Sequence, residues 1–173
     1  MHKTLKIIFY GGRQAGMVSL LTLMALQHRV VCVIPVDEPV ASSAKALGLN
    51  VKTPKDINLD EFVDYLKSLN ADLFVCCHGR QIIKARLLKR FKAINFHPCL
   101  YKYKGAHPIS RLLVDHETKA SVAAHWMTEK VDDGEVIVEL FKEVQGKTVA
   151  EIYNELYPLY SQALIEALNK IKQ

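Results

Sequence analysis

The opening of the chain restricts its possible folds more than any other feature. Residues 4–10 form an apolar, β-rich run that ends at Gly11 and Gly12, residues 15–27 are dense in leucine and methionine, and residues 29–36 return to valine and isoleucine. A strand, a glycine turn, a helix and a second strand in this order are typical of a βαβ unit with parallel strands. Because the strands are apolar almost throughout, we expect a sheet that is covered on both faces.

The later segments continue this alternation. Further strands are predicted at residues 72–77, 93–97, 121–127 and 136–143, and further helices at 39–47, 58–69, 85–90, 109–115 and from 148 to the C-terminus. Asn58 with Glu61, and Thr148 with Glu151, have the spacing of capping boxes, and Pro158 is expected to kink or split the last helix. The predicted fold is one doubly wound α/β domain over residues 1–173. Its sheet is mainly parallel, helices cover both faces, and the last strands extend one edge.

Composition and charge exclude several classes of protein. The 173 residues suffice for one domain with a substantial core. No apolar run reaches the roughly 20 residues that cross a bilayer, and the N-terminus lacks the apolar core of a signal peptide. We therefore expect a cytoplasmic protein with no membrane partner. The net charge is +5, but the basic residues are scattered, and the densest set has helical spacing, so nucleic-acid binding is not expected.

The cysteines and histidines indicate neither a disulfide framework nor a metal site. Cys76 and Cys77 are adjacent, so in a strand they point to opposite faces. We expect buried thiols in a reducing compartment. His107, His116 and His125 lack the helical spacing of a zinc enzyme, and no compact cluster of cysteine and histidine occurs, so no metal is expected.

Ligands of open α/β sheets bind at the carboxyl ends of the strands, where this sequence offers three segments. They are Gly11-Gly12, residues 78–81 and His97. The glycines could wrap a phosphate or carboxylate against the start of the next helix. They could equally form a simple tight turn, since neither the spaced glycines of a dinucleotide fold nor a P-loop is present.

Asn95 and His97 are two residues apart, so they project from the same face of the fourth strand. An asparagine can donate a hydrogen bond to a developing oxyanion, and a histidine can exchange a proton near neutral pH. Asp132 and Asp133 lie in a tight loop, where a carboxylate beside His97 would raise its pKa and fix its orientation. Spacing alone also allows a polar strand end and an ordinary acidic turn.

Taken together, these segments resemble the 10-formyltetrahydrofolate-dependent formyltransferases, which include glycinamide ribonucleotide, methionyl-tRNA and sugar N-formyltransferases. The resemblance is carried by INFHPCL at 94–100, YKGAHPI at 103–109, AHWM at 124–127, VDDGEVI at 131–137, ADLFV at 71–75 and GRQII at 79–83. These runs occur in the family's order and span nearly the whole chain.

The resemblance implies a co-substrate, a mechanism and a set of site residues. It implies 10-formyltetrahydrofolate as formyl donor and Asn95, His97 and Asp132 as catalytic residues. An amine attacks the formyl carbon, Asn95 and His97 stabilise the oxygen of the tetrahedral intermediate, and Asp132 holds His97 and helps proton transfer. The cofactor is expected against Arg80, Gln81, Ile82, Val131, Asp133 and Gly134, and the acceptor near Gly11, Gly12, Arg13 and His125.

Four departures from the family pattern concern the acceptor. The loop after Leu100 lacks a second proline and is one residue shorter. Ala123 stands where a serine or threonine is common. The first loop, residues 10–14, lacks the Gly-Ser-Asn of the glycinamide ribonucleotide enzyme. The sequence ends after one helix beyond the last strand, so the C-terminal barrel of the tRNA enzymes is not expected.

By elimination, we predict that the acceptor is the primary amine of a nucleotide-linked amino sugar. Glycinamide ribonucleotide is the alternative acceptor. Hydrolysis of formyltetrahydrofolate by a deformylase and a binding module without activity are further alternatives. The apolar content permits a monomer or a homodimer.

Overall fold

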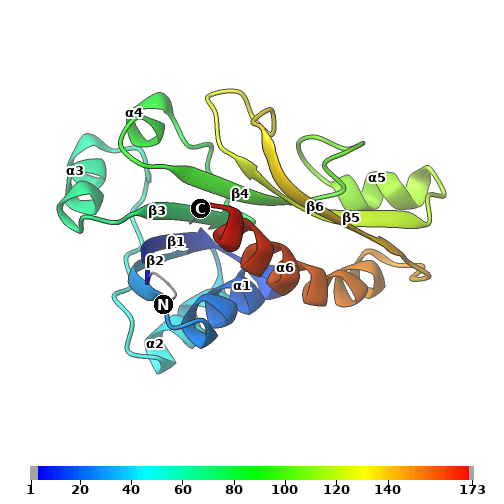
Figure 1. The fold of residues 1–173 in the computed structure, drawn as a ribbon, viewed down its shortest axis with the longest axis horizontal. Helices are drawn as coiled ribbons and strands as arrows, with labels where there is room; N and C mark the ends of the chain where they lie inside the picture. The colour runs from blue at the N-terminus through cyan, green and yellow to red at the C-terminus, as the bar shows by residue number, and fades with distance from the viewer. Residues whose placement is uncertain (1–3, 172–173) are drawn as a thin grey trace.

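The chain folds around a six-stranded sheet with strand order β2-β1-β3-β4-β5-β6 (Figure 1). The structure is a computed structural model that describes residues 4–171. The strands are β1 (Lys6–Gly11), β2 (Arg29–Pro35), β3 (Leu73–Cys77), β4 (Ala93–Pro98), β5 (Lys119–Trp126) and β6 (Val136–Glu143). The first four are parallel, whereas β5 and β6 run antiparallel along one edge. The doubly wound, mainly parallel sheet with an extended edge is therefore confirmed.

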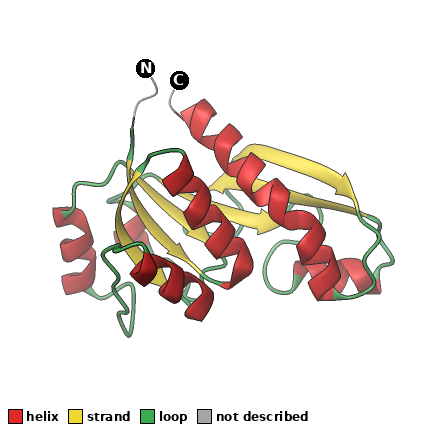
Figure 2. Cartoon of the chain, turned by 90° about the horizontal axis from the view of Figure 1, so that it is seen from below, coloured by secondary structure: helices red, strands yellow, loops and turns green. Residues whose placement is uncertain are grey.

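Helices cover both faces of this sheet. They are α1 (Arg13–Ala25), α2 (Glu38–Ala46), α3 (Asp60–Ser68), α4 (Ala85–Leu88), α5 (Pro108–Val114) and α6 (Val149–Ile171). One core layer contains residues of α1, α2, α5 and α6, and the other contains residues of α3 and α4. Figure 2 shows the long helix α6 lying across one face of the sheet.

The continuous apolar runs arise because the strands are buried on both faces. In β1, Ile7 and Phe9 point into the layer under α1 and α6, while Ile8 and Tyr10 point into the layer under α3 and α4. All four side chains are at most 3% exposed. A parallel strand between two helical layers therefore carries no alternation of polar and apolar residues.

The prediction that Asn58 caps a helix was wrong. Helix α3 begins at Asp60, and no side chain caps its first turn. The Asn58 side chain instead accepts a hydrogen bond from Lys84 N (2.8 Å) and donates one to Ile82 O (3.0 Å). The Asn58 side chain thus makes tertiary hydrogen bonds in place of the local helix cap that its spacing predicts.

The second capping box is confirmed, at the start of α6. Glu151 N donates to Thr148 Oγ1 at 3.2 Å, and Thr148 N donates to Glu151 Oε2 at 2.9 Å. The helix then continues through Pro158 to Ile171, so it is not split at the proline.

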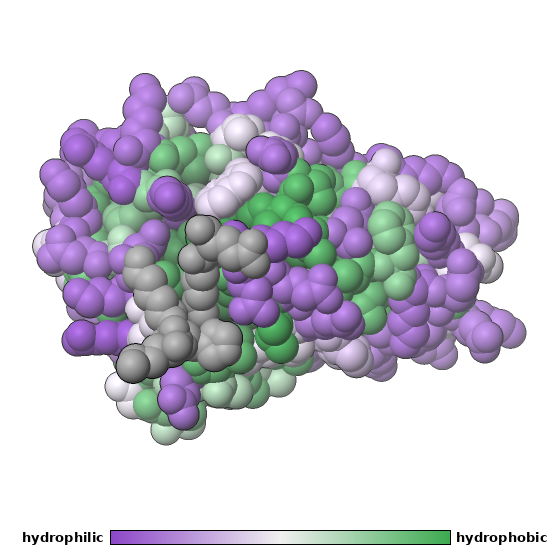
Figure 3. All heavy atoms as spheres, viewed as in Figure 1, coloured by the Kyte–Doolittle hydropathy of each residue, from purple (hydrophilic) through white to green (hydrophobic). Residues whose placement is uncertain are grey.

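Burial agrees with the expected state of the thiols. All four cysteines are buried and free, and burial raises the pKa of Cys76 to about 12. Within residues 4–171, no helix combines the length and the hydrophobicity needed to cross a membrane. On the face shown in Figure 3, hydrophilic residues lie around the periphery and hydrophobic residues show nearer its centre.

Candidate active site

A cleft with a volume of about 510 Å³ lies at the carboxyl ends of the parallel strands. It is lined by Arg13 at the start of α1, Asp37 after β2, residues 78–83 after β3, residues 95–98 of β4, residues 105–108, and His125, Met127, Val131, Asp132 and Tyr153. This is the edge at which ligands of open α/β sheets bind.

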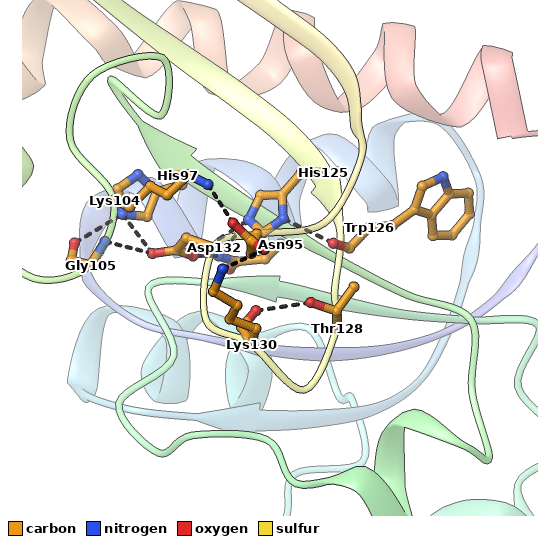
Figure 4. Close-up of polar contacts among 10 residues, drawn as sticks. Asn95, His97, Lys104, Gly105, His125, Trp126, Thr128, Lys130 and Asp132 are labelled. Atoms are coloured by element: carbon orange, nitrogen blue, oxygen red, sulfur yellow. Dashed lines mark hydrogen bonds and ion pairs between the residues drawn. The ribbon is translucent and has the colours of Figure 1, made fainter.

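The cleft brings together three side chains from distant parts of the sequence, Asn95, His97 and Asp132 (Figure 4). His97 Nε2 lies 3.1 Å from Asp132 Oδ2, and Asn95 Nδ2 donates to Asp132 Oδ1 at 3.3 Å. His97 and Asp132 are only 8% and 9% exposed. A carboxylate therefore lies between an amide and an imidazole in a largely desolvated wall of the cleft.

A hydrogen bond to His125 fixes the orientation of the Asn95 amide. His125 Nδ1 lies 2.9 Å from Trp126 O, and because a carbonyl oxygen only accepts, Nδ1 carries the proton. In the neutral ring, Nε2 then accepts a hydrogen bond from Asn95 Nδ2 at 3.2 Å. The two hydrogens of the Asn95 amide are thus directed at His125 and Asp132. His125, predicted to bind substrate, is 2% exposed and lines the cleft beneath Asn95.

The Gly105 peptide completes the network. Gly105 N donates to Asp132 Oδ2 at 2.9 Å, and His97 Nε2 donates to Gly105 O at 3.0 Å. Gly105 has a φ of +78°, a conformation that glycine adopts without steric cost. In the described residues, His97 Nδ1 is the one buried side-chain nitrogen or oxygen that lacks a hydrogen-bond partner. An unpaired buried nitrogen costs about 1–3 kcal/mol.

The network shifts the pKa values of Asp132 and His97 in opposite directions. Burial raises the pKa of Asp132, but the hydrogen bonds that the carboxylate accepts and the charge of His97 outweigh burial, so the pKa lies well below the ordinary value. Burial lowers the pKa of His97, but the hydrogen bond and charge of Asp132 outweigh it, so the pKa is raised. Asp132 is therefore a carboxylate at neutral pH, and protonation of His97 is favoured.

Left-handed backbone conformations gather around the cleft. Arg13, His78, His107 and Asp132 line it, and their φ angles are 58°, 57°, 56° and 51°. Each costs a residue other than glycine roughly 1–2 kcal/mol. Strain of this kind persists where the surrounding structure imposes it, and it concentrates at functional sites.

Hydrogen bonds to residues outside the cleft fix the conformation of the loop after β3. Tyr10 Oη accepts hydrogen bonds from Arg80 N (2.9 Å) and Gln81 N (2.8 Å). The Gln81 side chain turns to the segment before α3, where Oε1 accepts from Ile57 N at 2.9 Å. Gln81 therefore contributes backbone to the cleft, whereas the Ile82 side chain is 65% exposed there. Sequence reasoning missed Tyr10, for which no local signal exists.

Two residues of the acidic loop shape it rather than line the cleft. The Asp133 carboxylate lies 2.6 Å from Lys104 Nζ and 3.0 Å from Lys130 Nζ, and these hydrogen bonds lower its pKa to about 2. A Cβ atom on Gly134 would lie 1.7 Å from Trp126 O. Asp133 and Gly134, both predicted to contact cofactor, thus anchor the turn that presents Val131 and Asp132.

At the start of α1, a carboxylate of the chain itself takes the position expected for an anion. Arg13 N donates to Asp37 Oδ1 (2.9 Å) and Oδ2 (2.8 Å). A Cβ on Gly12 would lie 2.9 Å from Asp37 Oδ2, and one on Gly11 would lie 2.6 Å from Cys77 O. The glycines allow this close packing and do not line the cleft, whereas Arg13 does.

The short loop after β4 closes as a tight turn. Tyr103 N donates to Cys99 O at 2.8 Å, and Tyr101 N donates to Glu139 Oε1 at 3.0 Å. Ala123 pairs with His97 across β4 and β5. The departure at Ala123 therefore lies beside the polar network, whereas Tyr101 packs against Phe141 of β6 and does not line the cleft.

The fold and the cleft define an α/β protein whose buried acid–base network lies at the carboxyl edge of its parallel strands. A family model described as formyl transferase matches residues 24–168. The chain belongs to this formyl transferase family.

Similar proteins have different acceptors in their names. A methionyl-tRNA formyltransferase of Protochlamydia amoebophila is 30% identical over 98% of this chain and 58% of its own length. The chain spans 58% of the length of that relative and 60% of the length of the Orientia tsutsugamushi enzyme of the same name.

Among solved structures, phosphoribosylglycinamide formyltransferase of Campylobacter jejuni has a TM-score of 0.82 at 24% identity, covering 100% of this chain and 99% of that chain. A formyltetrahydrofolate deformylase of Pseudomonas putida has a TM-score of 0.77 at 16% identity, covering 96% of this chain and 64% of that chain. At these identities the two structures show a shared fold alone.

Proposed function

We propose that this protein transfers a formyl group from 10-formyltetrahydrofolate to the primary amine of a small molecule, with a nucleotide-linked amino sugar as the acceptor. The observation that carries the proposal is the buried contact of Asn95, His97 and Asp132 in the cleft of a formyl transferase family member. The buried free thiols also fit our proposal of a cytoplasmic location.

The cleft fits a folate. Ile82 and Val131 line it although they are 65% and 52% exposed, and Met127 lines it too. Exposed apolar side chains in a concave site are suited to a flat heteroaromatic ring, and the backbone groups of residues 80–82 that Tyr10 and Asn58 do not engage can hydrogen-bond to its edge. The bound cofactor would supply the activated one-carbon unit.

The polar network is suited to acyl transfer. The amine nitrogen bonds to the formyl carbon, the bond from that carbon to N10 of the folate breaks, and one proton moves from the amine to N10. A protonated His97 and the Asn95 amide stabilise the oxygen of the tetrahedral intermediate. To donate to this oxygen, the Asn95 amide would exchange one of its two present contacts, with His125 or with Asp132.

Asp132 keeps this arrangement in place. Its carboxylate lies 3.1 Å from His97 Nε2 and stabilises the imidazolium, and the Gly105 N–H donates to the same carboxylate oxygen at 2.9 Å. Through a water molecule, the carboxylate helps carry the proton from the amine to the leaving nitrogen.

The acceptor proposal draws support from the start of α1. Asp37 takes the Arg13 N–H, so an acceptor that needed its phosphate at this helix start would compete with a carboxylate. Glycinamide ribonucleotide stands as the alternative acceptor, and hydrolysis with water as acceptor is the second alternative.

The test is consumption of 10-formyltetrahydrofolate by the purified chain with nucleotide amino sugars, glycinamide ribonucleotide, initiator tRNA or water alone. We expect tetrahydrofolate release with a nucleotide amino sugar, and its loss in His97→Ala and Asp132→Ala with unchanged circular dichroism. Asp64→Asn is the matched control, because Asp64 is an exposed carboxylate that pairs with Arg86 and does not line the cleft. Full turnover in either cleft variant would refute the mechanism.

A further inference from the structure

A histidine that the proposed mechanism does not use lies in the wall of the cleft. His78 follows β3 directly, in the left-handed conformation, and lines the cleft with Arg13 and Tyr153. Its ring packs against Tyr153 and Tyr160 of α6, with centroid distances of 5.5 and 5.7 Å. The adjoining residues Gly79 and Arg80 turn toward Tyr10 in the opposite layer. His78 therefore faces the proposed folate loop from the α6 side.

The hydroxyl of Tyr160 determines which nitrogen of His78 carries the proton. Tyr160 is fully buried, and within residues 4–171 its Oη has one hydrogen-bond partner, His78 Nε2 at 2.9 Å. Burial raises the pKa of Tyr160 well above its ordinary value, so the hydroxyl keeps its proton. Unless it donates to His78, that proton is buried without an acceptor, at a cost of about 1–3 kcal/mol.

Because Nε2 accepts, the neutral ring carries its hydrogen on Nδ1. Burial and the nearby charges of Arg13 and His97 lower the pKa of His78 to about 4, so the ring is neutral at physiological pH. In the described residues, His78 Nδ1 has no hydrogen-bond partner and is not fully buried. This N–H is therefore accessible from the cleft.

We propose that His78 is an acceptor-binding residue, whose Nδ1–H is held by Tyr160 to donate a hydrogen bond to an oxygen atom of the amine substrate. This inference rests on the proposed function. A fixed neutral donor beside Arg13 suits a hydroxyl, carbonyl or phosphoryl oxygen, and the aromatic clamp keeps the ring from turning away. The backbone alternative, the Arg13 N–H, is already used by Asp37.

The tautomer can be measured without any activity. Nitrogen-15 NMR of the histidine-labelled full chain should show His78 with its proton on Nδ1 between pH 6 and 8, and Tyr160→Phe should yield a mixture of tautomers. A proton on Nε2 in the wild type would overturn the inference. Adding a uridine diphosphate-linked amino sugar or glycinamide ribonucleotide should move the Nδ1 signal, and no response to either would also overturn it.

Kinetics then test the role. His78→Asn keeps a residue that tolerates the left-handed backbone, and it should raise KM for the acceptor about 3- to 10-fold, as expected for one lost hydrogen bond. KM for 10-formyltetrahydrofolate should stay within about twofold. His116→Asn is the matched control, since His116 is exposed, has a φ of 53° and lies outside the cleft.

An unchanged acceptor KM, or a change confined to the folate KM, would contradict the assignment. If the wild type formylates no amine, the proposed function fails on its own. The NMR response to the two acceptors still decides whether His78 binds them.

Discussion

Replacing Asp132 by asparagine tests the polar network most directly, because it removes the charge and keeps the shape. The two carboxylate oxygens have different partners. Oδ2 receives Gly105 N at 2.9 Å and contacts His97 Nε2 at 3.1 Å, whereas Oδ1 receives Asn95 Nδ2 at 3.3 Å. The single oxygen of an asparagine should take the Oδ2 position, where the contacts are shorter, leaving its amide hydrogens facing the Asn95 amide.

The expected loss of stability is small. Two hydrogen bonds to the carboxylate and its ion pair with His97 each weaken by about 1 kcal/mol when the carboxylate becomes a neutral amide. The desolvation cost of a carboxylate that is 9% exposed disappears at the same time. We therefore expect the free energy of unfolding to fall by about 1–2 kcal/mol.

The expected loss of activity is much larger. Without the carboxylate, the His97 imidazolium loses its stabilising negative charge. The group that would carry the proton from the amine to the leaving nitrogen is also lost. Removing such a group typically lowers the rate by about 10²–10⁴, or roughly 3–5 kcal/mol of transition-state stabilisation. The kcat/KM for cofactor consumption should fall by that factor, and the pH dependence due to His97 should move to lower pH. A folded variant with kcat/KM within threefold of wild type would refute this reasoning.

Other perturbations test the surroundings of the cleft. Tyr10→Phe should raise KM for 10-formyltetrahydrofolate and lower the free energy of unfolding by about 1–3 kcal/mol, because two backbone N–H groups lose their acceptor; an unchanged KM would contradict this role. In denaturant titrations, Gly134→Ala should cost about 3 kcal/mol or more, since its Cβ would collide with Trp126 O, whereas Gly105→Ala should cost only about 1–2 kcal/mol for its positive φ; equal losses would refute the contrast. The pKa of His78 is about 4 in the folded protein and about 6.5 in the unfolded chain, so between these pH values only the unfolded chain binds the proton. The free energy of unfolding should therefore decline as the pH falls from about 6.5 to 4, and it should decline less in His78→Asn.

The sequence alone determined the features that depend on neighbouring residues. The order of apolar runs and glycines in residues 4–36 predicts parallel strands around a helix, because periodicity and turn chemistry are local properties. Two side chains that are two positions apart share a strand face, so Asn95 and His97 point into one space. The capping box of Thr148 and Glu151 is local too, and it forms as predicted.

Only the tertiary structure decided which distant groups meet. Asn58 has the spacing of a cap but binds the loop after β3, and Asp37 has no local signal but takes the Arg13 N–H. Likewise, the pairing of β4 with β5 puts His125 behind Asn95, and α6 puts Tyr160 against His78. Each of these polar groups has several locally possible partners of similar energy. The choice among them is made when the packed layers exclude water and leave few partners within reach of each buried polar group.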